Sequence, residues 1–225
     1  MTLGIHPIKL GVDHCYIIRG DGMILIDGGS PNQAKRFIKA MARLHLNPKD
    51  INLIVITHGH WDHIGSAKAI QEIAGAKLAM HHREKDWLEK SLKPLPPAVT
   101  TWGSVFKTIM SPLMPLVRFP PAHVDIVLGD EGLSLTDHGI PGRILYTPGH
   151  SMGSVSVLLD TGDAFVGDLA MNEFPLRLSP GLPIFAEDMS KVTESWRLLL
   201  AEGAKTVYPA HGKPFSAEIM RRVVS

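Results

Sequence analysis

Residues 53–66 read LIVITHGHWDHIGS, an apolar run followed at once by three histidines and an aspartate. The run LIVI is short and β-branched, which predicts a buried strand. A single histidine in a turn is ordinarily a cap or a solvated side chain. His58, His60, Asp62 and His63 fall within six positions, however, and this density predicts a metal site directly beyond the strand.

Three more segments repeat this arrangement, in which a predicted strand is followed by a residue type that binds metals. RILY is followed by His150, DAFVG by Asp168 and KTVY by His211. Ligand crevices in open α/β sheets form at the carboxyl ends of the strands, so all four segments point to one crevice. Neutral imidazole and carboxylate groups are good ligands for zinc and acceptable ones for iron or manganese. Seven such groups exceed the needs of one tetrahedral ion and suffice for two ions that share a carboxylate.

Strand and helix patterns alternate along both halves of the chain. HCYIIRG and MILIDGG are predicted strands joined by a tight turn, and Pro31–Leu44 has apolar residues at helical spacing, with Ser30 as the candidate N-cap. A helix is also predicted over His63–Ala74. The second half contains further strands, a helix over Asp188–Ala201 and a short closing helix. We therefore expect one α/β domain over residues 1–225, in which two similar α/β units pack sheet to sheet.

A segment at about residues 84–123 interrupts this alternation. It is rich in proline and in large apolar residues, as in KPLPPAVTTW and SVFKTIMSPLMPLVRFPP. Proline is rare in the central strands of a sheet because it cannot donate a backbone hydrogen bond. We expect this segment to be an inserted cover of short helices and loops.

The bulk composition is that of an ordinary globular protein, since 44% of the 225 residues are hydrophobic and 20% are charged. A net charge of +1 gives no support for nucleic acid or an anionic membrane as a partner. Cys15 is the single cysteine, so an intramolecular disulfide is excluded. The N-terminus does not resemble a signal peptide, and no stretch approaches the ~20 apolar residues of a membrane-spanning helix. The sequence thus predicts a cytoplasmic protein.

The motifs ILIDGG, THGHWDH, TPGH, VGDL and PAHG, in this order over nearly the whole chain, resemble those of the metallo-β-lactamase superfamily. The resemblance implies a four-layer αβ/βα sandwich, in which two mixed sheets are flanked by helices. It also implies two divalent metal ions, with zinc favoured and iron or manganese as alternatives. Asp27 matches a family aspartate that supports the metal-binding loop. The implied ligands are His58, His60 and His150 for the first ion, Asp62, His63 and His211 for the second, and Asp168 as the bridging carboxylate.

Departures from individual branches of the superfamily narrow the expected activity. The commonest zinc β-lactamases have cysteine where Asp168 stands, and flavodiiron proteins have glutamate in place of His60. Only KPFSAEIMRRVVS follows Gly212, whereas glyoxalase II enzymes bind glutathione with a helical extension, so a glutathione thioester is not the expected substrate.

The activity expected from the resemblance is hydrolysis of a small ester, thioester or lactone by a hydroxide that bridges the two ions. Asp62 is the expected catalytic residue, because its carboxylate could orient the nucleophile and later pass a proton to the leaving group. Two alternatives stay open. One is a persulfide dioxygenase with a single iron, which keeps the whole motif, and the other is a phosphodiesterase.

Apolar residues near the metal motifs are candidates for the walls of a substrate pocket. They come from the inserted segment and from EFPLRLSPGLPIF, residues 173–185, which follows Asp168. Apolar walls with few polar anchors suit an acyl or aromatic small-molecule substrate, although the same residues could form a homodimer contact. The pocket residues expected are Trp102, Phe106, Tyr146, Phe174 and Phe185, and Tyr146 could also donate to an oxyanion.

Overall fold

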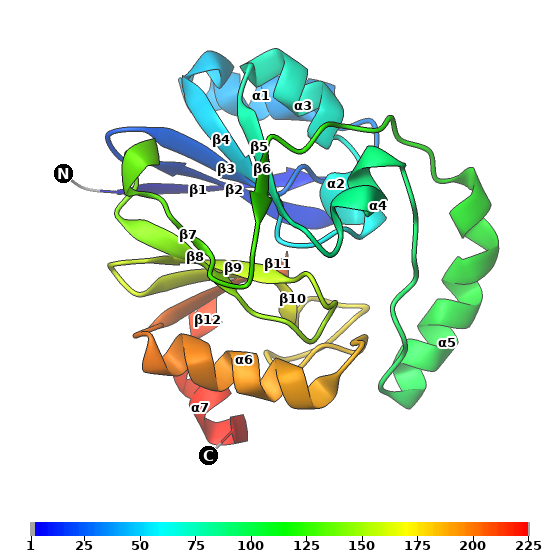
Figure 1. Ribbon diagram of the computed structural model, residues 1–225. Helices are drawn as coiled ribbons and strands as arrows, with labels where there is room; N and C mark the ends of the chain where they lie inside the picture. The colour runs from blue at the N-terminus through cyan, green and yellow to red at the C-terminus, as the bar shows by residue number, and fades with distance from the viewer. Residues whose placement is uncertain (1–2, 225) are drawn as a thin grey trace.

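Two six-stranded sheets pack face to face in the computed structural model, which describes residues 3–224 (Figure 1). The first sheet contains, in spatial order, β1 (Gly4–Leu10), β2 (Asp13–Arg19), β3 (Met23–Ile26), β4 (Ile51–Val55), β5 (Lys77–His81) and β6 (Ile126–Leu128). The strands β1 to β3 pair antiparallel. The pairs from β3 to β6 are parallel, so the sheet is mixed.

The second sheet is also mixed. It contains, in spatial order, β12 (Phe215–Ser216), β11 (Thr206–Gly212), β10 (Asp163–Asn172), β9 (Val155–Leu159), β8 (Gly142–Tyr146) and β7 (Leu133–Ser134). The pair β10 and β11 is parallel, and the other neighbouring strands run antiparallel.

Helices cover the outer faces of both sheets (Figure 1). The first sheet carries α1 (Ala34–Arg43) and α3 (Ala67–Ala74), and the second carries α6 (Met189–Ala201) and α7 (Glu218–Val224). The layers are therefore helices, sheet, sheet and helices, which confirms the predicted αβ/βα sandwich. In the described part of the chain, none of the helices combines the length and the apolar character that crossing a membrane requires.

Three apolar layers hold the sandwich together. Phe37 and Met41, one turn apart on α1, pack against the outer face of the first sheet. Phe165 belongs to the layer between the two sheets. Trp196 on α6 and Met220 on α7 close the outer face of the second sheet. Burial of these faces is the main favourable contribution to the stability of such a fold.

Two helix boundaries differ from the sequence prediction. The helix predicted over Pro31–Leu44 begins at Ala34, so Ser30 is not its N-cap. The helix predicted over His63–Ala74 is divided into α2 (Trp61–Ile64) and α3, with Gly65 and Ser66 between them. The division lets the Ser66 hydroxyl accept a hydrogen bond of 2.8 Å from the backbone N–H of Gln33, at the start of α1.

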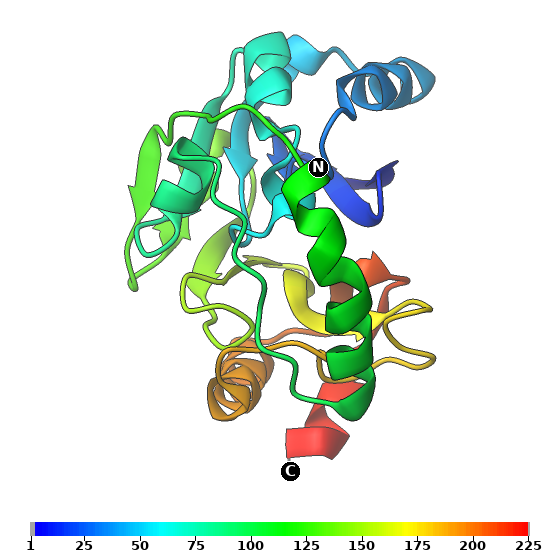
Figure 2. The ribbon, with the colours of Figure 1, turned by 90° about the vertical axis from the view of Figure 1, so that its right-hand side faces the viewer.

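Residues 82–125 connect β5 to β6 and include α4 (Lys85–Glu89), α5 (Thr101–Met110) and the 3-10 helix η2 (Ser111–Leu116). Figure 2 shows α5 running down the side of the sandwich, from the level of the first sheet to that of the second. The Trp102 indole N–H donates to the Pro175 carbonyl over 2.7 Å, and the Lys107 ammonium donates to the Pro96 carbonyl over 3.0 Å. These contacts hold α5 over the end of the sheets where the predicted metal ligands lie.

Candidate metal centre

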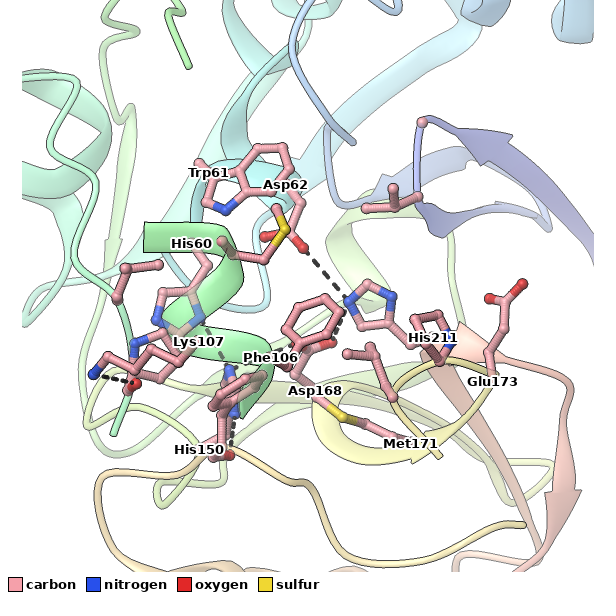
Figure 3. Close-up of a pocket in the computed structure, with 18 of the residues that line it drawn as sticks. His60, Trp61, Asp62, Phe106, Lys107, His150, Asp168, Met171, Glu173 and His211 are labelled. Atoms are coloured by element: carbon pink, nitrogen blue, oxygen red, sulfur yellow. Dashed lines mark hydrogen bonds and ion pairs between the residues drawn. The ribbon is translucent and has the colours of Figure 1, made fainter. Parts of the chain in front are cut away.

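The metal-binding residue types predicted from the sequence converge where strand ends of the two sheets meet (Figure 3). A bulge in β10 at Gly167 brings this strand close to the loop after β4. A side chain at Gly167 would not fit, because its Cβ would lie 2.5 Å from Thr57 Oγ1. The seven predicted ligands are His58, His60, Asp62 and His63 beyond β4, His150 beyond β8, Asp168 in β10 and His211 in β11.

The first cluster consists of His58, His60 and His150, each offering a ring nitrogen within 4.8 Å of the others. All three side chains are buried. His150 Nδ1 donates to the Phe185 carbonyl over 2.8 Å, so the lone pair of Nε2 faces the cluster, 3.0 Å from His60 Nδ1. Burial lowers the pKa of each imidazole, and that of His60 falls to about 3. The three rings are therefore neutral at pH 7, which is the form that binds a metal.

The second cluster consists of Asp62, His63, His211 and Asp13, the last of which the sequence motifs do not single out. One ligand atom of each lies within 4.8 Å of the others. Three carboxylates surround His211 Nε2, with oxygens of Asp168, Asp62 and Asp13 at 3.4, 3.5 and 3.5 Å. Burial alone would lower the pKa of His63 and of His211, but nearby carboxylates outweigh it and raise both pKa values well above the usual range.

Asp168 faces both clusters. Its Oδ1 lies 3.3 Å from His63 Nε2 and 3.4 Å from His211 Nε2, while its Oδ2 lies 3.7 Å from His150 Nε2. Burial alone would raise the pKa of Asp168, but the two histidines of the second cluster outweigh it and lower the pKa well below the usual range. The group is therefore a carboxylate whose two oxygens point to different clusters, the arrangement expected of a bridging ligand.

Asp27 is hydrogen-bonded to the loop that follows β4. Its backbone has a φ of +63° and directly follows β3. Its carboxylate accepts hydrogen bonds from the Thr57 backbone N–H at 2.8 Å and from the Thr57 hydroxyl. Asp27 Oδ2 also lies 2.9 Å from His63 Nδ1, so the Nε2 atom of His63 turns towards Asp168. Such a partner fixes the orientation and the tautomer of a ligand histidine.

Glu84 is a second buried acid that the sequence motifs do not reveal. It is 1% exposed, and its two carboxylate oxygens accept backbone hydrogen bonds from Gly59 at 2.6 Å and from Gly153 at 2.5 Å. Gly59 lies between His58 and His60, and Gly153 lies three residues beyond His150. Glu84 thus ties together the two loops that supply the first cluster.

The residues of both clusters fit divalent metal ions. Among the described residues, eight buried side-chain atoms have no hydrogen-bond partner, and five of them lie here: His58 Nε2, His63 Nε2, Asp168 Oδ1 and both oxygens of Asp13. Asp168 Oδ1 approaches His63 Nε2, but the contact is not a well-aligned hydrogen bond. Buried polar atoms are nearly always paired in folded proteins, and a cation would satisfy this set of nitrogen and oxygen donors.

An apolar cavity of about 520 Å³ opens above the clusters (Figure 3). His60, Asp62, His150, Asp168 and His211 belong to its lining. Its apolar walls include Trp61 from α2, Phe106 and Met110 from α5, and Phe174 and Phe185 from the segment after β10. Three of the five pocket residues expected from the sequence therefore line this cavity, namely Phe106, Phe174 and Phe185.

The other two expected pocket residues do not line it. Tyr146 ends β8, and its ring stacks on His81 with centroids 4.6 Å apart, while its hydroxyl donates to the Met152 carbonyl. Trp102 lies one turn before Phe106 on α5, and its indole N–H donates to the Pro175 carbonyl. The stacking on His81 and the hydrogen bond to Met152 hold the Tyr146 side chain away from the cavity. Tyr146 is therefore not placed to donate to an oxyanion.

Comparisons with known proteins agree with this arrangement. The family model of the metallo-beta-lactamase superfamily matches residues 9–211. The chain is 24% identical over 234 residues to the probable metallo-hydrolase YflN of Bacillus subtilis (strain 168), a match covering 97% of this chain and 87% of YflN. It is 28% identical over 184 residues to the hydroxyacylglutathione hydrolase GloC of Haemophilus influenzae, covering 78% of this chain and 77% of GloC.

A solved structure of TTHA1623 in a di-iron-bound form has the same fold, with a TM-score of 0.68 at 22% identity. The similarity covers 96% of this chain and 97% of that chain. The family match at residues 9–211 includes every residue of both clusters. The family predicted from the motifs is confirmed, and the chain belongs to the metallo-beta-lactamase superfamily.

Proposed function

We propose that this protein is a hydrolase that uses two divalent metal ions to cleave a small ester, thioester or lactone. The observation that carries the proposal is the position of Asp168, whose two oxygens face different ligand clusters at the floor of an apolar cavity. A single ion would leave one cluster of buried polar groups without a cation, and uncompensated buried groups of this kind are unfavourable.

His58, His60 and His150 would hold the first ion, and Asp168 would lie between the two positions. Asp62, His63 and His211 would hold the second. Zinc suits the set of three imidazoles, with iron or manganese as alternatives. When bound, such ions supply a Lewis acid for a carbonyl oxygen and a water acidic enough to act as a nucleophile at neutral pH.

Asp62 is the candidate for the group that transfers protons during the reaction. Its side chain is 15% exposed and borders the cavity, whereas that of Asp168 is 7% exposed. Burial alone would raise the pKa of Asp62, but the imidazole of His211, 3.5 Å away, and the charge of His63 outweigh it and lower the pKa. The ionised carboxylate can therefore accept a proton from the attacking nucleophile and later release one to the leaving group.

The walls of the cavity favour an apolar acyl or aromatic group. Two lysines border the cavity, but both already have partners. The Lys9 ammonium lies 2.8 Å from Glu173, and that of Lys107 donates to the Pro96 carbonyl. Few polar groups are left in the wall to recognise a charged substrate, whereas Phe106, Phe174 and Phe185 contribute apolar rings to it.

The relatives support hydrolysis as the type of reaction. One is named a probable metallo-hydrolase and another a hydroxyacylglutathione hydrolase, the substrate of which contains an acyl group. This chain shares 28% identity with the latter. The similarity supports the class of reaction and does not specify the leaving group of the substrate.

The experiment that tests the proposal combines metal analysis with a substrate panel. Elemental analysis by plasma mass spectrometry should find about two divalent ions per chain, as a binuclear site requires. Acyl p-nitrophenyl esters, acyl thioesters and lactones should be hydrolysed, and His60→Ala and Asp168→Ala should abolish the activity while the fold survives. Faster hydrolysis of bis-p-nitrophenyl phosphate would indicate a phosphodiesterase instead. A single iron and oxygen uptake with a persulfide would indicate a dioxygenase.

A further inference from the structure

Asp13 is a buried carboxylate beside the second cluster, and its one ion-pair contact among residues 3–224 is with His211, itself a predicted ligand. Its side chain is 0% exposed at the start of β2. Neither of its oxygens has a hydrogen-bond partner among residues 3–224, and no lysine or arginine of these residues forms an ion pair with it. A buried acid that accepts no hydrogen bond is unfavourable, so its presence requires a reason other than stability of the metal-free fold.

The backbone directs this carboxylate at the second cluster. The chain turns between β1 and β2 at Gly11, which has a φ of +96°, and Asp13 pairs with Leu10 across the hairpin. Asp13 Oδ1 then lies 3.5 Å from His211 Nε2, the same distance that separates His211 from Asp62. An oxygen of Asp13 is also within 4.8 Å of ligand atoms of Asp62 and His63.

We propose that Asp13 is an additional ligand of the second metal position. This assignment rests on the two-ion centre proposed above. With Asp13 included, the second position combines two imidazoles with the carboxylates of Asp13, Asp62 and Asp168. The first position combines three imidazoles with Asp168 alone.

The two positions therefore differ in the metal that they favour. Carboxylate oxygen is a hard ligand that suits manganese and ferrous iron, whereas a set dominated by imidazole suits zinc. Three carboxylates also place more negative charge around the second ion than around the first. The centre is consequently asymmetric, with zinc favoured at the first position and manganese or ferrous iron at the second.

Metal competition on Asp13 variants tests this assignment. Metal-free wild type, Asp13→Asn and Asp13→Ala are loaded with one equivalent of Zn²⁺ per chain and then dialysed against a large excess of Mn²⁺, and the bound metals are counted by plasma mass spectrometry. Bound manganese is also followed by its electron paramagnetic resonance spectrum. Wild type should retain one zinc and one manganese, and both variants should keep the zinc and bind manganese at least about 10-fold more weakly. Asp160→Asn, which removes an exposed aspartate just beyond β9, is the matched control and should behave as wild type.

Melting temperatures show whether Asp13 binds a metal or only stabilises the fold. If Asp13 is a ligand, metal-free Asp13→Asn should melt at the same temperature as metal-free wild type or higher, and it should gain less from added Mn²⁺. A metal-free variant that melts at a lower temperature and gains as much as wild type would overturn the assignment.

The same experiment distinguishes this assignment from the proposed function. If wild type binds two ions and the Asp13 variants take up manganese as wild type does, the assignment is wrong and the hydrolase proposal stands. If wild type binds only one ion, the two-ion centre and the role of Asp13 are both wrong.

Discussion

Glu84 Oε2 accepts a hydrogen bond of 2.6 Å from the backbone N–H of Gly59, between the first two histidines of the metal motif. The other oxygen of the same carboxylate accepts from Gly153, in the loop that carries His150. One side chain thereby sets the separation of two loops that are far apart in the sequence. Because His60 Nδ1 and His150 Nε2 lie 3.0 Å apart, a small shift of either loop would alter the first cluster.

Glu84→Ala should lower the free energy of unfolding by about 2–4 kcal/mol, because two buried N–H groups would lose their acceptor. Glu84→Gln should have a smaller effect, since the amide keeps one acceptor oxygen. Chemical denaturation measures both changes, and metal analysis should show weaker binding at the first position. Glu187→Gln is the matched control, because Glu187 also accepts a backbone hydrogen bond in this loop, from Met152, but is exposed. Equal effects of Glu84→Gln and Glu187→Gln would contradict this role of burial.

Gly167→Ala should disturb the metal centre more than Gly203→Ala does. Both glycines have a positive φ, of +52° and +95°, so alanine costs each about 1 kcal/mol in backbone strain. A Cβ at Gly203 has nothing within 4 Å, whereas a Cβ at Gly167 would lie 2.5 Å from Thr57 Oγ1. The clash would displace Thr57 and with it the neighbouring His58. Denaturation together with metal counting should show loss of metal only in Gly167→Ala, and equal metal content in the two variants would refute the explanation.

The metal ligands could be predicted from the sequence because of where they fall along the chain. His58, His150 and His211 each follow or end an apolar run, and the ends of such runs locate one edge of a sheet. Asp13 and Glu84 lack this signal. Asp13 is at the start of its strand and not at the end, and Glu84 lies among charged residues in REKDWLEK, so each resembles a solvated acid. Their burial arises from contacts between distant segments, which a local pattern does not contain.

A local sequence pattern also does not show which expected pocket residues reach the cavity, or that β1 is a strand. Tyr146 and Phe185 are both close in sequence to metal motifs, but only Phe185 lines the cavity, because Tyr146 stacks on His81. Proximity along the chain does not specify which side of a strand a side chain occupies. β1 contains Pro7, which breaks the pattern of a strand, yet β1 is an edge strand and an edge tolerates proline.

Asp27→Asn should weaken metal binding at the second position by about 10- to 100-fold, as the loss of a ligand-orienting partner usually does. The new amide keeps an acceptor for Thr57 but can place its NH₂ group opposite His63 Nδ1. His63 would then carry its proton on Nε2, the atom that faces Asp168. Titration with a chromophoric chelator as competitor would resolve the two affinities. The affinity at the first position should be unchanged, and an unchanged affinity at the second would show that Asp27 does not control the tautomer.

Removal of the metals should destabilise the protein reversibly. Without cations, the carboxylates of Asp13, Asp62 and Asp168 lie close together in a buried site. A ligand present at a free concentration 1,000 times its Kd stabilises a folded protein by about 4 kcal/mol per site. Thermal melts before chelation, after chelation and after return of Zn²⁺ should show a fall in Tm and its recovery. A Tm that stays constant while the metals leave would mean that these residues do not bind them in the folded state.

Phe106→Ala should change the preference of the enzyme for acyl chain length. Phe106 projects from α5 into the cavity, where its ring centroid lies 6.1 Å from that of Phe185. Removing the ring takes away apolar contact that only a long acyl chain can use, and such contact contributes about 1–3 kcal/mol. The value of kcat/KM should therefore fall by about 10-fold or more for octanoyl p-nitrophenyl ester and change little for the acetyl ester. Ile109→Ala provides the control, because Ile109 lies on the same helix but is 61% exposed and outside the cavity. If both variants lower kcat/KM equally for both esters, α5 acts on the stability of the site, and the acyl group binds elsewhere.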